Sequence, residues 1–124
     1  MASRKLSDLT PELKEICEEF KEQCAEAGID VLVYCTWRGE EEQNKAFAEG
    51  KSKLKYPKSK HNCVDSEGNP ASRAFDCVPT KGNLLLWSDA QKYAKMGEIG
   101  RGLGLRWGGE FRGLVDKPHF EMKD

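Results

Sequence analysis

The chain has 124 residues, 20 of them basic and 21 acidic, which gives a net charge of −1 at pH 7. This length is enough for one domain with its own hydrophobic core. The balanced charge provides no general attraction to nucleic acid or to an anionic membrane, and no apolar stretch approaches the length of a membrane span. We therefore expect a single domain over residues 1–124 that is a monomer and binds neither nucleic acid nor membrane.

The cysteines indicate a reducing compartment. Their number is odd, and their spacing lacks the pairing pattern of a disulfide framework. The five are Cys17, Cys24, Cys35, Cys63 and Cys77. The first residues also lack the apolar segment of a secretory signal peptide, so we expect synthesis in the cytoplasm without an export signal.

The first half of the chain predicts two helices with a strand between them. Thr10 is a good N-cap, Pro11 suits a first helical turn, and apolar residues then recur at helical spacing as far as Gly28, which ends the helix. Residues 29–35 form a short apolar run rich in β-branched side chains, as in a buried strand. A second helix is expected over about residues 40–48.

The second half predicts three strands and one more helix. Residues 65–70 have turn composition, residues 74–78 form a strand, and residues 89–101 form a helix capped by Ser88 or Asp89. Strands at 105–107 and 119–122 enclose a glycine-rich connection. Helices and strands interleave without a regular βαβ repeat, which favours an α+β fold with a short antiparallel sheet flanked by about three helices.

The two histidines carry the strongest chemical signal. His61 and His119, together with Asp76, supply the three protein ligands that a catalytic zinc needs, with one position left for water. Asp116 precedes His119 by three residues and supplies a carboxylate that can accept a proton from that water. The proline at position 118 favours a fixed, extended bend between the two. These residues predict a small zinc peptidase.

Other assignments of the same residues remain open at this stage. A single histidine is more often a surface or core residue than a ligand, and Asp65 is nearer to His61 than Asp76 is. A site built from Cys63, Cys77 and the histidines would use good zinc ligands but lacks a C-x-x-C pair. The acidic turn at residues 65–70 lacks the terminal glutamate of an EF-hand calcium loop.

A run of lysines precedes His61. Charge runs are usually solvated loops, but this one is also suited to contact an anionic polymer. Its members are Lys51, Lys53, Lys55, Lys58 and Lys60.

Taken together, the motifs resemble those of the M15 peptidases, which include D-Ala-D-Ala carboxypeptidases and L-alanyl-D-glutamate endopeptidases of bacteriophages. The resemblance extends from about residue 31 to residue 121 with the motifs in the same order. It rests on R-G-E-E-E-Q from Arg38, S-K-H ending at His61, A-F-D ending at Asp76, W-G-G from Trp107, and D-K-P-H-F-E from Asp116. It implies a fold similar to that of hedgehog domains and D-Ala-D-Ala peptidases.

The resemblance also implies roles for individual residues. His61, Asp76 and His119 would bind zinc, and Asp116 would be the general base, with Glu121 or Glu110 as the next choices. Arg38 would face the scissile carbonyl, where its forked donors can stabilise charge on oxygen; the alternative is a surface salt bridge to the following glutamates. Ser59 would hydrogen-bond the substrate or orient a ligand.

Two departures from the family pattern stand out. Fourteen residues separate His61 from Asp76, where the family has a short connection, and a hairpin excursion at residues 65–70 would account for the difference. Gly39 follows Arg38 in place of a serine.

Among the M15 peptidases, the phage endolysins fit best, because they share the aspartate of the D-x-P-H motif and the small size. The expected activity is cleavage of the L-Ala–D-Glu bond in the peptidoglycan stem peptide. The enzyme would remain in the cytoplasm of the infected bacterial host until a separate pore-former lets it reach the cell wall. The alternatives are a D-Ala-D-Ala carboxypeptidase and a non-catalytic, hedgehog-like zinc-binding module.

Overall fold

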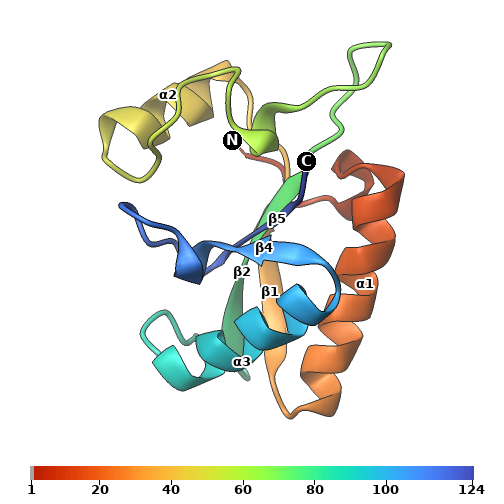
Figure 1. Ribbon diagram of the computed structural model, residues 1–124, viewed down its shortest axis with the longest axis vertical. Helices are drawn as coiled ribbons and strands as arrows, with labels where there is room; N and C mark the ends of the chain where they lie inside the picture. The colour runs from red at the N-terminus through yellow and green to blue at the C-terminus, as the bar shows by residue number, and fades with distance from the viewer. Residues whose placement is uncertain (1) are drawn as a thin grey trace.

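The computed structural model describes residues 2–124 (Figure 1). Within this range, three α-helices accompany a five-stranded sheet in which every strand pair is antiparallel. The helices are α1 Pro11–Glu26, α2 Glu40–Ala48 and α3 Ala90–Gly102; the strands are β1 Asp30–Cys35, β2 Ala74–Lys81, β3 Leu84–Leu85, β4 Leu105–Trp107 and β5 His119–Met122. The predicted α+β fold with three helices and a small antiparallel sheet is confirmed.

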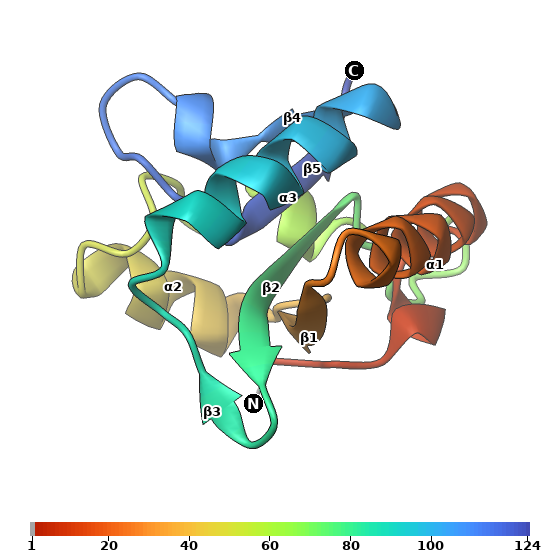
Figure 2. The ribbon, with the colours of Figure 1, turned by 90° about the horizontal axis from the view of Figure 1, so that it is seen from below.

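The strands lie in the order β1-β2-β5-β4, and β3 pairs with the far end of β2. Helices α1 and α3 contact each other and pack on the same face of this sheet, whereas α2 lies apart from both (Figures 1 and 2). The opposite face of the sheet is therefore left for the functional residues.

The helices begin and end where local sequence signals place them. The Thr10 hydroxyl accepts a hydrogen bond from the Leu13 backbone N–H at 3.0 Å, and Gly28 has the left-handed φ of +81° that the end of α1 requires. Asp89 caps α3 in the same way through the N–H of Lys92. No helix within residues 2–124 combines the length and the apolar character needed to cross a membrane.

Alternation along the strands divides the sheet into a core face and a polar face. Phe75 and Phe120 lie opposite each other on β2 and β5 and stack in the core with ring centroids 5.6 Å apart. The neighbouring residues Asp76, His119 and Glu121 therefore point to the other face, since successive side chains of a strand alternate. The core residues thus fix the orientation of the polar ones.

The sheet differs from the sequence prediction at one end. Strand β2 continues three residues past position 78 to Lys81 and forms a hairpin with β3, a strand that the sequence analysis did not assign. Gly82, at φ +59°, makes the tight turn between them.

The insertion after His61 folds back on itself as expected. Val64 and Pro70 form an antiparallel bridge, and Gly68 adopts a φ of +84° at the tip. The chain enters and leaves the excursion at neighbouring points, so the fourteen residues between His61 and Asp76 do not separate the two side chains in space.

Candidate metal centre and catalytic cleft

Three side chains converge on the polar face of the sheet. Asp76 and His119 are direct partners in the β2–β5 register, and Asp76 Oδ1 lies 3.1 Å from His119 Nδ1. His61 comes from a 3-10 turn at Lys60–Asn62, and its Nε2 lies 3.3 Å from both of those atoms. All three residues are at least nine-tenths buried. The structure thus brings together the three side chains that the sequence analysis predicted to bind zinc; metal binding itself stays a prediction.

The geometry of this cluster fits a zinc ion. Ligand atoms about 2.0–2.1 Å from a tetrahedral zinc lie roughly 3.3 Å from one another. The observed separations of 3.1, 3.3 and 3.3 Å form a nearly equilateral triangle of that size. Two imidazoles and one carboxylate also match the donor preference of zinc, and three ligands leave a position open.

Hydrogen bonds on the far side of each ring turn the correct nitrogen toward the cluster. His61 Nδ1 lies 2.8 Å from the carbonyl oxygen of Thr36, and His119 Nε2 lies 2.8 Å from Glu121 Oε1. Each of these acceptors holds the ring proton, so His61 Nε2 and His119 Nδ1 are free to bind a metal. Sequence reasoning considered Glu121 only as a substitute base and missed this positioning contact.

The buried charges of the cluster stabilise one another. Burial alone lowers the pKa of an imidazole, but the carboxylate of Asp76 and its hydrogen bond raise the pKa of His61 to about 10. Burial likewise opposes the ionised form of Asp76, yet His61 and His119 hold the pKa of this carboxyl well below its usual range. Asp76 is therefore ionised at neutral pH, as a metal ligand must be.

Arg38 is hydrogen-bonded to the carboxylate of Asp76. Its Nη2 donates to Asp76 Oδ2 at 3.0 Å, which leaves Oδ1 facing the histidines. Its Nη1 lies 3.4 Å from Oε1 of Gln43, a fully buried residue of α2 that also donates to the Leu54 carbonyl at 2.7 Å. Arg38 orients Asp76 and also lines the cleft; its contact with a scissile carbonyl remains a prediction.

Asp116 lies beside the cluster on the loop before β5. Its carboxylate, Asp76 and His119 offer ligand atoms within 4.8 Å of one another. Its backbone carbonyl accepts from the His119 N–H at 3.1 Å, and a Cβ at Gly108 would collide with that same carbonyl. Burial and the charge of Asp76 raise the pKa of Asp116 above the usual value of an aspartate, which makes its carboxylate a stronger proton acceptor.

Ser59 shapes the turn that carries His61. Its hydroxyl accepts from the His61 backbone N–H at 3.2 Å, while its own N–H donates to Asn62 Oδ1 at 3.1 Å. Ser59 also lines the cleft, so the expected contact with substrate stays a prediction.

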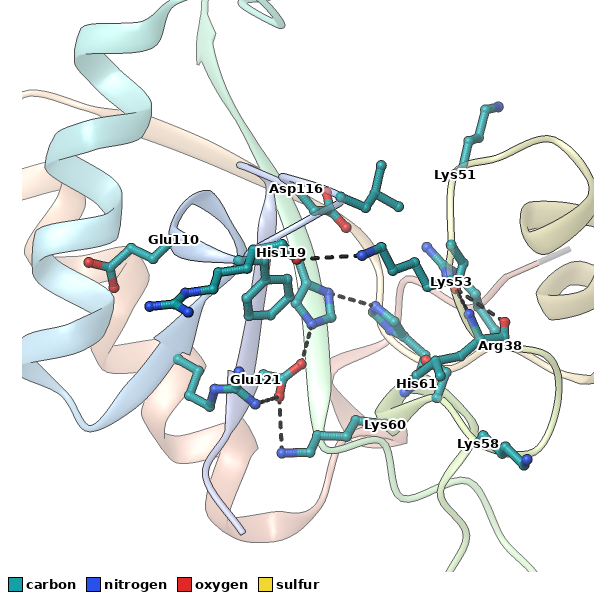
Figure 3. A pocket seen from close by; sticks show the side chains of 17 residues that line it. Arg38, Lys51, Lys53, Lys58, Lys60, His61, Glu110, Asp116, His119 and Glu121 are labelled. Atoms are coloured by element: carbon teal, nitrogen blue, oxygen red, sulfur yellow. Dashed lines mark hydrogen bonds and ion pairs between the residues drawn. The ribbon is translucent and has the colours of Figure 1, made fainter.

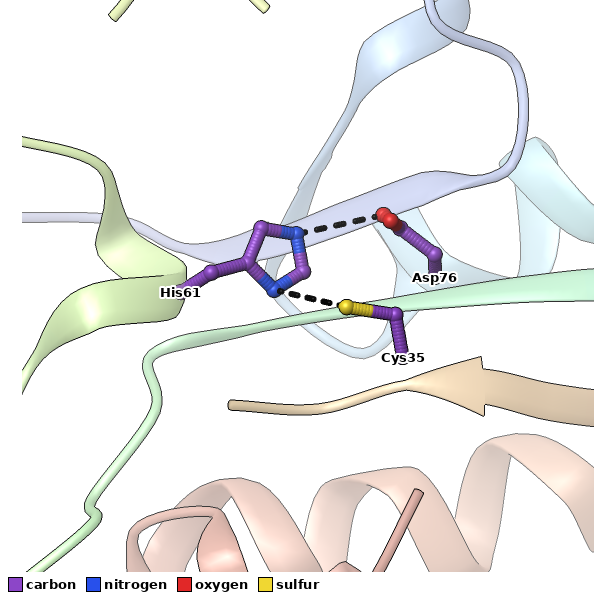
Figure 4. A group of neighbouring side chains, drawn as sticks. All are labelled: Cys35, His61 and Asp76. Carbon is purple, nitrogen blue, oxygen red and sulfur yellow. Dashed lines mark hydrogen bonds and ion pairs between the residues drawn. The ribbon is translucent and has the colours of Figure 1, made fainter. Parts of the chain in front are cut away.

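Two alternative ligands considered from the sequence, Asp65 and Cys77, are engaged away from this cluster. Asp65 is exposed and its Oδ1 accepts from the N–H groups of Glu67 and Asn69, so it stabilises its own loop. Cys77 packs in the hydrophobic core. The cysteine beside the site is instead Cys35, whose Sγ lies 3.8 Å from His61 Nδ1 (Figure 4). A β-bulge between Val33 and Cys35 places Cys35 opposite Asp76, and no sequence signal indicated it.

The cluster lies at the base of a cleft of about 730 Å³ (Figure 3). Although the chain has a net charge of −1, seven basic side chains line this cleft: Arg38, Lys51, Lys53, Lys58, Lys60, Arg106 and Arg112. Four of the five lysines in the run before His61 are among them. The cleft is therefore suited to an acidic substrate.

A three-donor cluster beside a carboxylate, in an open cleft, is the arrangement that the metallopeptidase class of enzymes uses. A profile of the family described as D-alanyl-D-alanine carboxypeptidase, of the M15 peptidases, matches residues 28–122. The chain belongs to the M15 peptidase family and is a peptidase.

Individual relatives agree with this assignment. The chain is 26% identical to the peptidoglycan L-alanyl-D-glutamate endopeptidase CwlK of Bacillus subtilis, over 94% of this chain and 74% of that protein. It is 32% identical to an L-alanyl-D-glutamate peptidase of Listeria phage A118, over 77% of this chain but only 31% of the phage protein. The fold is similar to that of the L-Ala D-Glu endopeptidase ChiX of Serratia marcescens, with a TM-score of 0.74 over 99% of this chain and 89% of ChiX, at 21% identity.

Asp76→Ala should remove bound metal, whereas Asp65→Ala should retain it. Only Asp76 shares the cluster with both histidines, and Asp65 is occupied by its own loop. Elemental analysis of the purified variants measures the metal content. Because Asp76→Ala leaves Arg38 without its partner, Asp76→Asn and a thermal melt serve as checks on folding. Loss of metal from Asp65→Ala alone would identify the other aspartate as the ligand.

Glu121→Gln should weaken metal binding by about 10–100-fold, as the loss of an outer carboxylate typically does at a histidine-bound metal. Glu110→Gln is the matched control, because Glu110 is half-exposed and pairs with Arg101 on the rim of the cleft. Competition with a chromophoric chelator gives both affinities. Equal affinities for Glu121→Gln and the wild type would show that Glu121 does not position His119.

Proposed function

We propose that this protein is a zinc-dependent peptidoglycan endopeptidase that hydrolyses the bond between L-alanine and D-glutamate of the stem peptide. The observation that carries the proposal is the triangle of His61 Nε2, Asp76 Oδ1 and His119 Nδ1 beside Asp116 in a basic cleft. The names of the Bacillus, Listeria phage and Serratia proteins support the choice of bond.

The residues of the cleft divide the chemistry between them. His61, Asp76 and His119 would hold a zinc ion, which would be the electrophile that makes water nucleophilic at neutral pH. Asp116 accepts the proton of the attacking water at its carboxylate and returns it to the leaving amine. Arg38 keeps Asp76 in place through Oδ2 and lines the cleft, where its positive charge can stabilise charge on the carbonyl oxygen.

We further propose that the enzyme is a phage endolysin that acts as a monomer. It would wait in the cytoplasm of the infected host and reach the wall after a separate pore-former permeabilises the membrane. The similarity to the Listeria phage peptidase supports this role. CwlK is a bacterial protein, so a bacterial wall-remodelling enzyme is the rival. Lysis of cells only when a pore-former is co-expressed would favour the endolysin.

A carboxypeptidase that removes terminal D-alanine is the second candidate, because the matching family carries that description. Digestion of purified peptidoglycan followed by mass spectrometry separates the two. The endopeptidase should release fragments with a new amino terminus at D-glutamate, and amidation of the peptide carboxy terminus should not prevent cleavage. Free D-alanine as the main product would establish the carboxypeptidase instead.

Asp116→Asn should keep the metal and the fold but lower kcat by about a hundredfold or more, the usual contribution of a general base. The amide preserves the shape of the side chain and cannot accept the proton. Stopped assays on a stem-peptide substrate, with metal content measured on the same sample, provide the test. A near-normal kcat with full metal content would show that Asp116 is not the general base and that another carboxylate of the cleft has this role.

A further inference from the structure

The basic side chains of the cleft differ in whether a carboxylate neutralises them. Arg38 pairs with Asp76, while Lys60 and Arg106 both pair with Glu121 at 3.0 and 3.1 Å. Lys51 pairs with Glu49. Among the carboxylates of residues 2–124, none lies within ion-pair distance of the three remaining cations of the cleft, which are Lys53, Lys58 and Arg112. These three are available to an anionic ligand.

Lys53 is the best placed of the three. It belongs to the segment after α2 on one side of the cleft, and its Nζ reaches the Arg112 carbonyl oxygen on the opposite side at 3.5 Å. In Figure 3 its ammonium group points toward Asp116 and His119. Gly113 lies beside this crossing: its φ is +85°, and a Cβ there would force the ammonium group of Lys53 to shift. One long hydrogen bond leaves the ammonium group two further donors.

The proposed substrate places a carboxylate in this region. Glutamate has two carboxyl groups, of which one joins the next residue and the other stays free. The scissile nitrogen belongs to that same glutamate, so the free carboxylate lies a few bonds from the atom that Asp116 protonates. Arg38 is already held by the ligand Asp76, which leaves Lys53 as the unpaired cation that reaches across the cleft.

We propose that Lys53, assisted by Arg112, binds the free carboxylate of the glutamate on the C-terminal side of the scissile bond and makes the enzyme selective for a free acid over an amide at that position. This inference rests on the proposed function and deepens it. Lys53 is a specificity-determining residue in this account, since it binds the part of the substrate that does not react.

The test compares two synthetic peptides, acetyl-L-Ala-D-Glu-L-Lys joined through the glutamate side chain, with the remaining glutamate carboxyl either free or amidated. Lys53→Gln should raise KM for the free acid by about tenfold, the usual cost of a lost charge-assisted hydrogen bond, and should leave kinetics on the amide unchanged. Lys53→Arg should restore most of the affinity for the acid. Lys55→Gln is the matched control, because Lys55 belongs to the same run but lies over the Phe47 ring and does not line the cleft.

Any of the following results would overturn the assignment. Lys53→Gln could affect both peptides equally, which would indicate a structural role, or affect neither. Alternatively, Lys55→Gln could reproduce the whole effect, which would indicate general attraction by the charge run. Failure of the wild-type enzyme to cut either peptide between alanine and glutamate would refute the proposed function, and the role of Lys53 with it. Cleavage without discrimination between acid and amide would refute only the role of Lys53.

Discussion

The antiparallel pairing of β2 with β5 places Asp76 opposite His119, and the rest of the site depends on that register. The same pairing stacks Phe75 on Phe120 beneath α1 and α3. A slip of one residue would turn the phenylalanines to solvent and the metal-site residues into the core. The hydrophobic core therefore holds the register, and the register holds two of the three ligand atoms 3.1 Å apart.

Charge in the site is arranged in two layers. In the inner layer two carboxylates are held by several cationic or imidazole partners: Asp76 by the histidines and Arg38, and Glu121 by His119, Lys60 and Arg106. These contacts, together with burial, account for the directions in which the pKa values of the site shift; that of Glu121 falls to about 2. The outer layer consists of cations without carboxylate partners at the mouth of the cleft. A chain with almost no net charge can thus present a strongly basic cleft.

Much of the fold was predictable from local signals. Caps and helical spacing located α1 and α3 to within about two residues, and α2 runs over the predicted residues 40–48. The candidate ligands were predictable because only two histidines exist and because the motifs around them keep the order of the family. Turn composition likewise predicted a hairpin excursion at residues 65–70. The structure has this hairpin, closed by the antiparallel bridge between Val64 and Pro70.

Most of the contacts that the sequence analysis missed depend on tertiary geometry. Cys35 reaches the site only because a bulge shifts β1 by one residue, and Glu121 positions His119 because both share a face of β5. Lys53 crosses the cleft to the Arg112 carbonyl, beside Gly113, sixty positions later in the chain. The Cys35 and Lys53 contacts join segments that meet only in the folded protein. The contact between His119 and Glu121, by contrast, follows from their two-residue spacing on one strand, and that spacing was the signal in the sequence that could have revealed it.

The central claim is that His61, Asp76 and His119 bind one zinc ion. Anomalous diffraction at the zinc edge from a crystal of the protein purified without added metal tests it most directly. The account predicts a single peak about 2.0–2.2 Å from His61 Nε2, Asp76 Oδ1 and His119 Nδ1, with Thr36 and Glu121 still bound to the opposite ring nitrogens. A peak bound by Cys35 without His119, or a fully active enzyme without a peak, would contradict it.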